Sequence, residues 1–406
     1  MALPKAPSPG ATDASTPIVI LGLSRGVFHH GALGIARSAG RLGIPVHRVA
    51  LERRAPAALS RYSRGWRSLA AGATDEQALE ALHELSRDVG RAILIPVDDA
   101  GSVFVEEHAD ALEGDYLFPQ QPAGLAQALS SKREMYELCQ QHDIPTPVSL
   151  FPESERDVLE HAERTTFPVV AKCIEAADAP ASAPRVAIAE NREELIEAYR
   201  VMQSPDGRNV MLQEYVPGTP ETVWMFNGYF DENSDCMIAF TGKKIRQSPP
   251  YTGATTLGVC TANDTVQETT IRFMKAVGYR GILDIGYRFD HRDGRYKLLD
   301  VNPRIGGTFR LFVGDNGMDV LRTLYLDLTK QEVPTTSPHE GRRWIVEPLD
   351  VASSITYWRR GDLKLGTWVR SFRGVREAAW FAADDPLPFL SLWIWLLLQW
   401  RPRAAR

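Results

Sequence analysis

Apolar runs and helical repeats alternate over the first part of the chain. A continuous apolar run that ends near a glycine predicts a buried strand, and spacing of three to four predicts a helix. The pattern predicts, in order, a strand over 16–24, a helix over 30–43, a strand over 44–51, a helix over 73–90 and a strand over 91–100. This order is typical of a parallel sheet, so residues 17–125 are expected to form a small α/β domain. Residues 1–16 are rich in Pro, Ala, Ser and Thr and are expected to form a disordered leader.

Polar residues follow two of these strands. The turn over 22–34 lacks the GxGxxG spacing of a dinucleotide fingerprint, which excludes the usual nicotinamide or flavin site there. Ligands of open α/β sheets bind at the carboxyl ends of strands, where Ser24, Arg25, Asp98 and Asp99 lie. These four are candidate ligand contacts. The alternative is that the two acids cap the next helix.

Two lysines stand in unusual places in the next part of the chain. Ser131 and Glu134 form a capping-box pattern that begins a helix with Lys132 at its first position. A cation at a helix N-terminus gains little unless an anion lies beside the free N–H groups, although a solvated lysine is the alternative. Lys172 follows four apolar residues in the predicted strand over 167–175, and a lysine in such a run needs a partner or a ligand.

Strands with helices on one side dominate residues 130–330, which predicts an α+β arrangement. The pattern predicts a strand and helix over 185–202, strands over 209–216 and 235–248, and a hairpin over 279–304 that turns at 290–295. Residues 176–185 have no periodicity and are expected to form a loop.

Oxygen-bearing side chains gather on the two strands of the predicted hairpin. Alternate residues of a strand face one side, so Asp300 and Asn302 are expected to point together while Val301 points into the core. The hairpin brings Asp284 of the preceding strand near them. Two carboxylates and an amide oxygen suit Mg²⁺ or Mn²⁺ rather than zinc. The alternative is a structural turn, because Asp and Asn near proline are common turn formers.

The ordered motifs resemble the ATP-grasp superfamily, most closely the carboxylate–amine ligases related to the large chain of carbamoyl-phosphate synthetase. The motifs are Lys132, Lys172, the segment LQEYVPGTPE at 212–221, Asp284 and DVNPR at 300–304. The resemblance covers about residues 17–330. It implies a Rossmann-like N-terminal domain over 17–125 and an ATP-grasp domain over 126–335. The latter has a lid subdomain over about 167–215 and binds ATP between the lid and the grasp subdomain. Residues 336–406 are left as a small Arg/Trp-rich C-terminal region.

The resemblance also implies a role for each matching residue. Implied ATP-binding residues are Lys132 and Lys172 at the α- and β-phosphates, Gln213, Glu214, Tyr215 and Val216 as the adenine hinge, and Glu221 at the ribose. Implied metal ligands are Asp284, Asp300 and Asn302, and implied catalytic residues are Asn302 and Arg304, with Arg304 at the transferring phosphoryl group. The superfamily most often has Glu at the position of Asp300, and aspartate favours one bound metal over two.

A basic strand end lies in the region that borders the acceptor site of such ligases. Lys244 and Arg246 share a face if the strand stays regular, and they are predicted to bind a substrate carboxylate or another anion. The alternative is a solvated basic strand end. The expected reaction is ATP-dependent joining of a carboxylate to an amine through an acyl phosphate, with release of ADP and phosphate. The competing functions are a small-molecule kinase and a non-catalytic nucleotide-binding protein docked on the membrane.

Composition and charge narrow the classes of partner. Apolar residues make up 44 % of the chain and charged residues 24 %, which is the balance of a soluble globular protein. The net charge of −5 gives no basic field for nucleic acid. The four cysteines form no CxxC motif, which argues against zinc or disulfides and fits the cytoplasm.

The C-terminal run over 387–400 is apolar, carries three tryptophans and is followed by arginines. It is shorter than the roughly 20 residues that span a bilayer as a helix. Tryptophans and arginines suit an interfacial anchor, which would place the protein at the inner face of the membrane. The alternative is a terminal helix buried on its own protein or in a homodimer.

Overall fold

The computed structural model describes residues 12–24, 30–51, 55–174, 180, 183–204 and 209–399. The chain forms two compact units: unit 1 comprises Met1–Ala126, Met225–Asp284 and Asn302–Arg406, and unit 2 comprises Gln127–Trp224 and Ile285–Val301. The division into three domains stays a prediction. The predicted leader up to residue 11, Arg25, and residues 176–179, 181 and 182 of the predicted loop over 176–185 lie outside the described residues.

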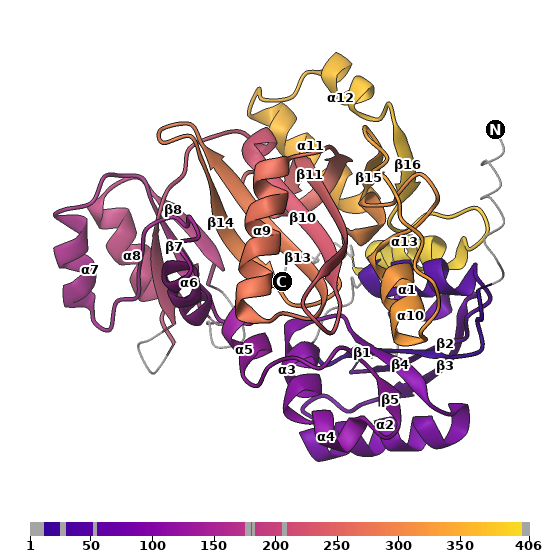
Figure 1. Ribbon diagram of the computed structural model, residues 1–406. Helices are drawn as coiled ribbons and strands as arrows, with labels where there is room; N and C mark the ends of the chain where they lie inside the picture. Colours follow the sequence, from indigo (N-terminus) through magenta and orange to yellow (C-terminus); the bar gives the residue numbers. More distant parts are fainter. Residues whose placement is uncertain are drawn as a thin grey trace, which may run out of the picture. The chain divides into compact units, whose positions relative to one another are not determined.

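The N-terminal part of unit 1 contains a five-stranded parallel sheet with the order β3-β2-β1-β4-β5 (Figure 1). Its strands are β1 Ile18–Gly22, β2 Val46–Ala50, β3 Ser63–Ser68, β4 Ala92–Pro96 and β5 Tyr116–Leu117. Its helices are α1 His30–Gly40, α2 Asp75–Val89, α3 Asp99–Glu107 and α4 Ala109–Leu112. The strand–helix order predicted over 16–100 is confirmed, except that the pattern missed β3, whose residues are mostly half-exposed and polar.

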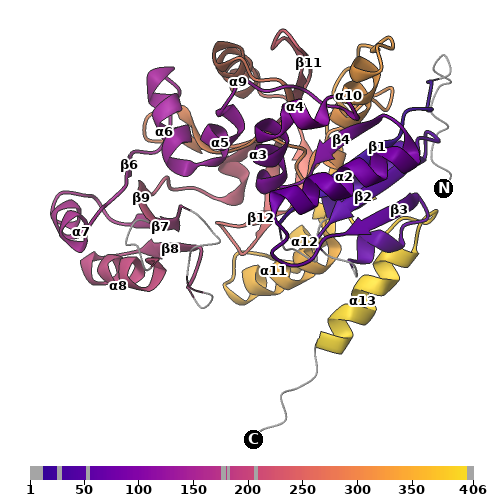
Figure 2. The same ribbon diagram turned by 90° about the horizontal axis from the view of Figure 1, so that it is seen from below.

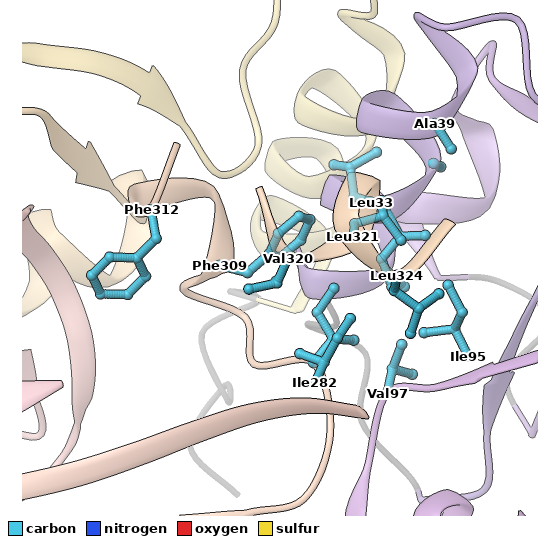
Figure 3. Packing of buried hydrophobic residues seen from close by; sticks show 14 of the residues in the cluster. Leu33, Ala39, Ile95, Val97, Ile282, Phe309, Phe312, Val320, Leu321 and Leu324 are labelled. Carbon is cyan, nitrogen blue, oxygen red and sulfur yellow. The ribbon is translucent and has the colours of Figure 1, made fainter. Parts of the chain in front are cut away.

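Both faces of β1 are buried because α/β layers cover both sides of the sheet. Ile18 and Ile20 belong to one apolar cluster, and Val19 and Leu21 to another on the opposite face. The first cluster joins segments far apart in the sequence. Figure 3 shows its packing, with Leu33, Ile95, Ile282, Phe309, Leu321 and Leu324 pointing toward one another.

A second, seven-stranded sheet has the order β14-β13-β10-β11-β12-β15-β16. Its strands are β10 Val223–Phe230, β11 Cys236–Ser248, β12 Ala254–Cys260, β13 Gly281–Asp290, β14 Arg295–Asn302, β15 Arg343–Ile345 and β16 Val375–Ala378. The helices α9 Asp264–Val277 and α10 Val320–Leu328 belong to unit 1, and α9 lies along the strands of this sheet (Figure 1). The predicted hairpin is present as β13 and β14, with its turn between Asp290 and Arg295.

Unit 2 is built on a four-stranded antiparallel sheet with the order β6-β9-β7-β8. Its strands are β6 Ser149–Leu150, β7 Val169–Cys173, β8 Val186–Ala189 and β9 Val210–Glu214. Its helices are α5 Leu125–Ser130, which begins at the end of unit 1, α6 Lys132–Gln141, α7 Glu155–Ala162 and α8 Arg192–Met202. Ser131 caps α6 as predicted, since its Oγ accepts a hydrogen bond from the Glu134 N–H.

The C-terminal helices are α11 Glu347–Arg359, α12 Leu365–Ser371 and α13 Leu387–Gln399 (Figure 2). Buried ion pairs tie this part of the chain to the rest of unit 1. Arg37 of α1 donates to Asp385 at 3.0 Å, and both side chains are buried. Among the described residues, no helix combines the length and the apolar character needed to cross a bilayer.

We predict that Asp350→Ala lowers the free energy of unfolding by about 3–5 kcal/mol, because it leaves a buried guanidinium without its carboxylate. Asp350 accepts two hydrogen bonds of 2.8 Å from Arg246, and the two side chains are 1 % and 4 % exposed. Urea denaturation measures the loss. The matched control is Asp235→Ala at the exposed Lys275–Asp235 pair, which is expected to cost less than about 1 kcal/mol. Equal losses in the two variants would show that the Arg246–Asp350 pair does not hold this region.

Candidate active site

A cluster of cations in unit 2 forms around Lys172 of β7. The Lys172 ammonium donates to Gln213 Oε1 at 2.7 Å, and Gln213 Nε2 donates to Ser149 Oγ at 3.2 Å. The sheet register explains the first contact. Val170 pairs with Gln213 across β7 and β9, and Lys172 lies on the same face as Val170. The position predicted from sequence therefore has a neighbour from β9 and a defined orientation.

Burial is the largest influence on Lys172 and lowers its pKa from 10.5 to about 8. The carboxylate of Asp300 favours the charged form, whereas the cations Lys132 and Arg288 oppose it. The local environment of Lys172 therefore holds more positive than negative charge. A polyanion bound among these side chains would relieve this repulsion, which is the chemistry that a nucleotide polyphosphate offers. Lys132 reaches the same region, since its ammonium donates to the Ile174 carbonyl at 2.7 Å.

Arg288 of β13 is a candidate site residue that the sequence reasoning missed. It is 9 % exposed, its Nη2 donates to the Gly218 carbonyl, and its guanidinium lies 6.0 Å from the centre of the Tyr215 ring. Burial lowers the pKa of Arg288. Its Nε has no hydrogen-bond partner among the described residues. Strand alternation from Asp284 through Gly286 would have placed Arg288 on the same face, and that signal was available in the sequence.

The segment predicted as an adenine hinge begins at the end of β9. The Gln213 side chain is committed to Lys172 and Ser149. The Glu214 carboxylate accepts hydrogen bonds from Lys297 at 3.1 Å and from Arg292. These side chains are therefore engaged within unit 2, so a hinge at this place would use the backbone, as predicted. Tyr215 and Val216 follow directly, and Glu221 lies exposed in the short 3-10 helix Pro220–Thr222.

In unit 1, the strand end after β14 forms a connected chain of polar contacts. Asn302 Nδ2 donates to the Asp284 carbonyl at 3.2 Å, and Asn302 Oδ1 accepts from Arg304 Nη2 at 3.0 Å. The Arg304 Nε in turn donates to the Asp99 carboxylate at 2.7 Å. The structure therefore brings together three residues predicted from the motifs and Asp99, the first residue of α3.

The two acids that follow β4 have different roles. Asp98 caps α3, because its Oδ1 accepts a hydrogen bond from the Gly101 N–H at 2.8 Å. Its other oxygen accepts from the Ser24 N–H at 2.9 Å. The helix-capping alternative is therefore correct for Asp98. Asp99 instead pairs with Arg304 and is half exposed.

Glycines leave room for the predicted metal-ligand carboxylates. A Cβ at Gly306 would overlap the carboxylate of Asp284, and a Cβ at Gly286 would overlap that of Asp300. Val301 is 5 % exposed and points away from its neighbours, as the alternation predicted. Each predicted ligand offers an oxygen atom: Asp284 and Asp300 offer carboxylate oxygens, and Asn302 offers its amide oxygen. Oxygen is the hard ligand that Mg²⁺ prefers.

The predicted substrate-binding pair Lys244 and Arg246 lies elsewhere on β11. The pairing of β11 with β12 is irregular on both sides of Arg246, so the alternation expected from the sequence is interrupted there. Arg246 is 3 % exposed and bonded to Asp350 and Ser371, while the Lys244 ammonium donates to the Gly253 carbonyl at 3.2 Å. This placement favours a structural role for Arg246 over contact with a substrate.

The chain is similar in sequence to a curated ligase. No protein-family model matches it. It is 25 % identical over 272 residues to a D-aspartate ligase of Enterococcus faecium, a match that covers 63 % of this chain. The chain spans 64 % of the length of that curated relative, which is just under two thirds.

Solved structures with related folds are more numerous. The L-amino acid ligase of Bacillus licheniformis has a TM-score of 0.58 at 16 % identity, covering 80 % of this chain and 75 % of its own. The N5-carboxyaminoimidazole synthetase of Staphylococcus aureus complexed with ADP has a TM-score of 0.61 at 12 % identity, covering 80 % of each chain. The biotin carboxylase domain of the Hydrogenobacter thermophilus 2-oxoglutarate carboxylase, in complex with MgADP, has a TM-score of 0.58 at 15 % identity, covering 80 % of this chain and 73 % of its own.

At these identities the solved structures establish the fold alone. With the sequence relative, they confirm the resemblance to ATP-grasp carboxylate–amine ligases and the predicted fold class.

We predict that the stability of the wild type rises relative to Lys172→Met as the pH increases from 7 to about 9.5. The pKa of Lys172 is lowered in the folded state, so between pH 8 and 10.5 the unfolded chain binds more protons and alkaline pH favours folding. The expected gain over that interval is about 2 kcal/mol. Urea titrations at both pH values measure it, and Lys330→Met controls for the loss of one lysine. A constant difference between wild type and Lys172→Met would rule out a desolvated ammonium.

Proposed function

We propose that the chain is an ATP-dependent ligase that joins a carboxylate to an amine through an acyl phosphate. The observation that carries the proposal is the desolvated cation cluster around Lys172, which holds excess positive charge on the strand that the ATP-grasp resemblance assigns to phosphate. The sequence similarity to a D-aspartate ligase supports the same reaction class.

We assign the phosphates of ATP to Lys132 and Lys172, with Arg288 as an additional cation beside them. The adenine contacts would come from the backbone of residues 213–216, and the ribose contact from Glu221. This assignment is supported by the positions of the two lysines, since both ammonium groups reach the same end of β7. The Arg288 contacts with Gly218 and Tyr215 would hold the segment after β9 in one conformation.

We assign Mg²⁺ to Asp284, Asp300 and Asn302. When bound, the ion supplies charge neutralisation for the phosphate oxygens. Arg304 lies beside Asn302 and would bind the transferring phosphoryl group with its planar guanidinium. Asp99 holds the Nε of that guanidinium and so fixes its orientation.

The reaction follows from these assignments. A carboxylate oxygen of the substrate attacks the γ-phosphorus of ATP, and the bond to the β–γ bridging oxygen breaks to release ADP. The amine nitrogen then attacks the acyl carbon, inorganic phosphate leaves, and the amine loses a proton. Because the substrate carboxylate is itself the nucleophile, the protein mainly positions the groups and balances their charge.

The substrate class that we propose is amino acids on at least one side of the new bond. A D-aspartate ligase and an L-amino acid ligase are among the similar proteins, and both names specify amino acids.

The four cysteines form no disulfide, which suits a reducing compartment such as the cytoplasm.

We predict that Asp300→Asn and Arg304→Gln each reduce ADP formation at least about 100-fold, the scale seen when a charge-stabilising group is removed. The assay measures ADP release with amino acids offered both as carboxylates and as amines. ADP release is expected to need both substrates, whereas a kinase would release ADP without an amine. Unchanged melting temperatures establish that the variants fold.

The matched control is Asp235→Asn, at an exposed aspartate of unit 1 outside the proposed site. It is expected to keep the wild-type rate. Wild-type turnover in Asp300→Asn would rule out the metal assignment, and turnover without any amine would rule out the ligase reaction.

A further inference from the structure

Helix α11 has its polar and apolar faces inverted. Its buried residues are Asp350, Ser353, Ser354 and Tyr357, which share one face at helical spacing. An adjacent face exposes Val351, Ile355 and Trp358, at 48 %, 45 % and 67 %. A surface helix normally turns its apolar stripe toward the core. The buried Arg246–Asp350 pair fixes α11 in this orientation, so its apolar stripe stays in solvent.

Helix α12 extends this apolar surface. Leu365 and Val369 are 71 % and 57 % exposed. Leu365 borders a groove of about 360 Å³ together with Val351 and Ile355 of α11, and Trp358 and Trp368 also line it. We call the exposed residues of 351–376 the α11–α12 patch. In Figure 1, α12 lies at the outer edge of unit 1.

The α11–α12 patch is strongly basic. Its exposed cations are Arg359, Arg360, Lys364, Arg370, Arg373 and Arg376. Within residues 351–376 the single acid is Asp362, which accepts a hydrogen bond from Tyr251. The whole chain has a net charge of −5, so this concentration of positive charge is local. Exposed apolar surface accompanied by many cations is typical of surfaces that bind a partner or a membrane.

The combination of tryptophans and cations fits an anionic lipid surface. Tryptophan is favoured at the boundary between lipid and water, and Lys and Arg are attracted to anionic headgroups. A second copy of the patch is a poor occupant, because its cations would face the same cations. We propose that the α11–α12 patch docks the protein peripherally on an anionic lipid surface. The proposal does not rest on the ligase activity.

Helix α13 adds a separate apolar surface. Leu390, Ile394 and Leu397 are 51 %, 58 % and 68 % exposed and lie on one face by their spacing. This helix carries no charged residue, so the basic character belongs to the α11–α12 patch. Vesicle binding that depends on anionic lipid can therefore be assigned to the α11–α12 patch rather than to α13.

The test is co-sedimentation of the full chain with vesicles of phosphatidylcholine, with and without about one third phosphatidylglycerol. Binding is expected only to the anionic vesicles and is expected to weaken at high salt. The variants Arg359→Glu/Arg370→Glu and Trp358→Ala/Leu365→Ala are each expected to lower the bound-to-free ratio at least about tenfold. Circular dichroism and melting temperature establish that the variants fold. Folding is expected because the substituted residues are exposed.

Controls use the same chemical changes elsewhere. Arg156→Glu and Val148→Ala replace exposed residues of unit 2 and are expected to leave vesicle binding unchanged. Ile394→Glu/Leu397→Glu tests α13. The proposal is overturned if the α13 variant alone abolishes binding, or if neutral vesicles bind equally well. It is also overturned if the patch variants convert a dimer to a monomer while the wild type binds no vesicles.

Discussion

The close approach of carboxylates to glycine backbone is the constraint on which the candidate site depends. The carboxylate of Asp284 occupies the space of a missing Cβ at Gly306, and that of Asp300 occupies the corresponding space at Gly286. Any side chain at either glycine would displace a proposed metal ligand. The segment after β14 therefore has to carry glycine for a packing reason, quite apart from backbone conformation. At the same strand end, Asn302 donates to the Asp284 carbonyl and accepts from Arg304, so these three residues form one connected group.

The charges around Lys172 suit the binding of phosphate groups. Lys172 is held in a partly buried place that lowers the pKa of its ammonium to about 8, beside further cations. At neutral pH these surroundings lower the stability of the folded protein, because they disfavour the charged ammonium. Groups perturbed in this way are typical of functional sites, where a bound anion would offset the repulsion. Phosphoryl transfer requires positioned positive charge around phosphate oxygens and little else from the protein. The side chains whose mutual repulsion opposes folding are thus suited to binding a polyphosphate.

Sequence patterns predicted the features that depend on neighbours along the chain. The strands β1, β4, β7 and β13, the cap at Ser131 and the orientation of Val301 all follow from local periodicity or local hydrogen bonding. Strand β3 escaped because its residues are half exposed and show no apolar alternation.

Features that depend on distant partners were not predictable in this way. Arg246 was expected to contact substrate, yet its partner Asp350 lies about a hundred residues later, and the strand pairing is irregular on both sides of Arg246. Asp99 pairs with Arg304 across a still longer separation. The inverted helix α11 also needs the tertiary ion pair to be understood. Arg288 is different, since alternation from Asp284 was sufficient to place it.

The most direct test of the account follows an oxygen atom. Once a carboxylate substrate is found, it is prepared with ¹⁸O in its carboxyl group and incubated with ATP and the amine, and the phosphate is examined by mass spectrometry. Formation of an acyl phosphate predicts that one ¹⁸O per turnover passes from the carboxylate to inorganic phosphate, in equal amount to the ADP and amide formed. Unlabelled phosphate, released with normal amide formation, would contradict the proposed reaction.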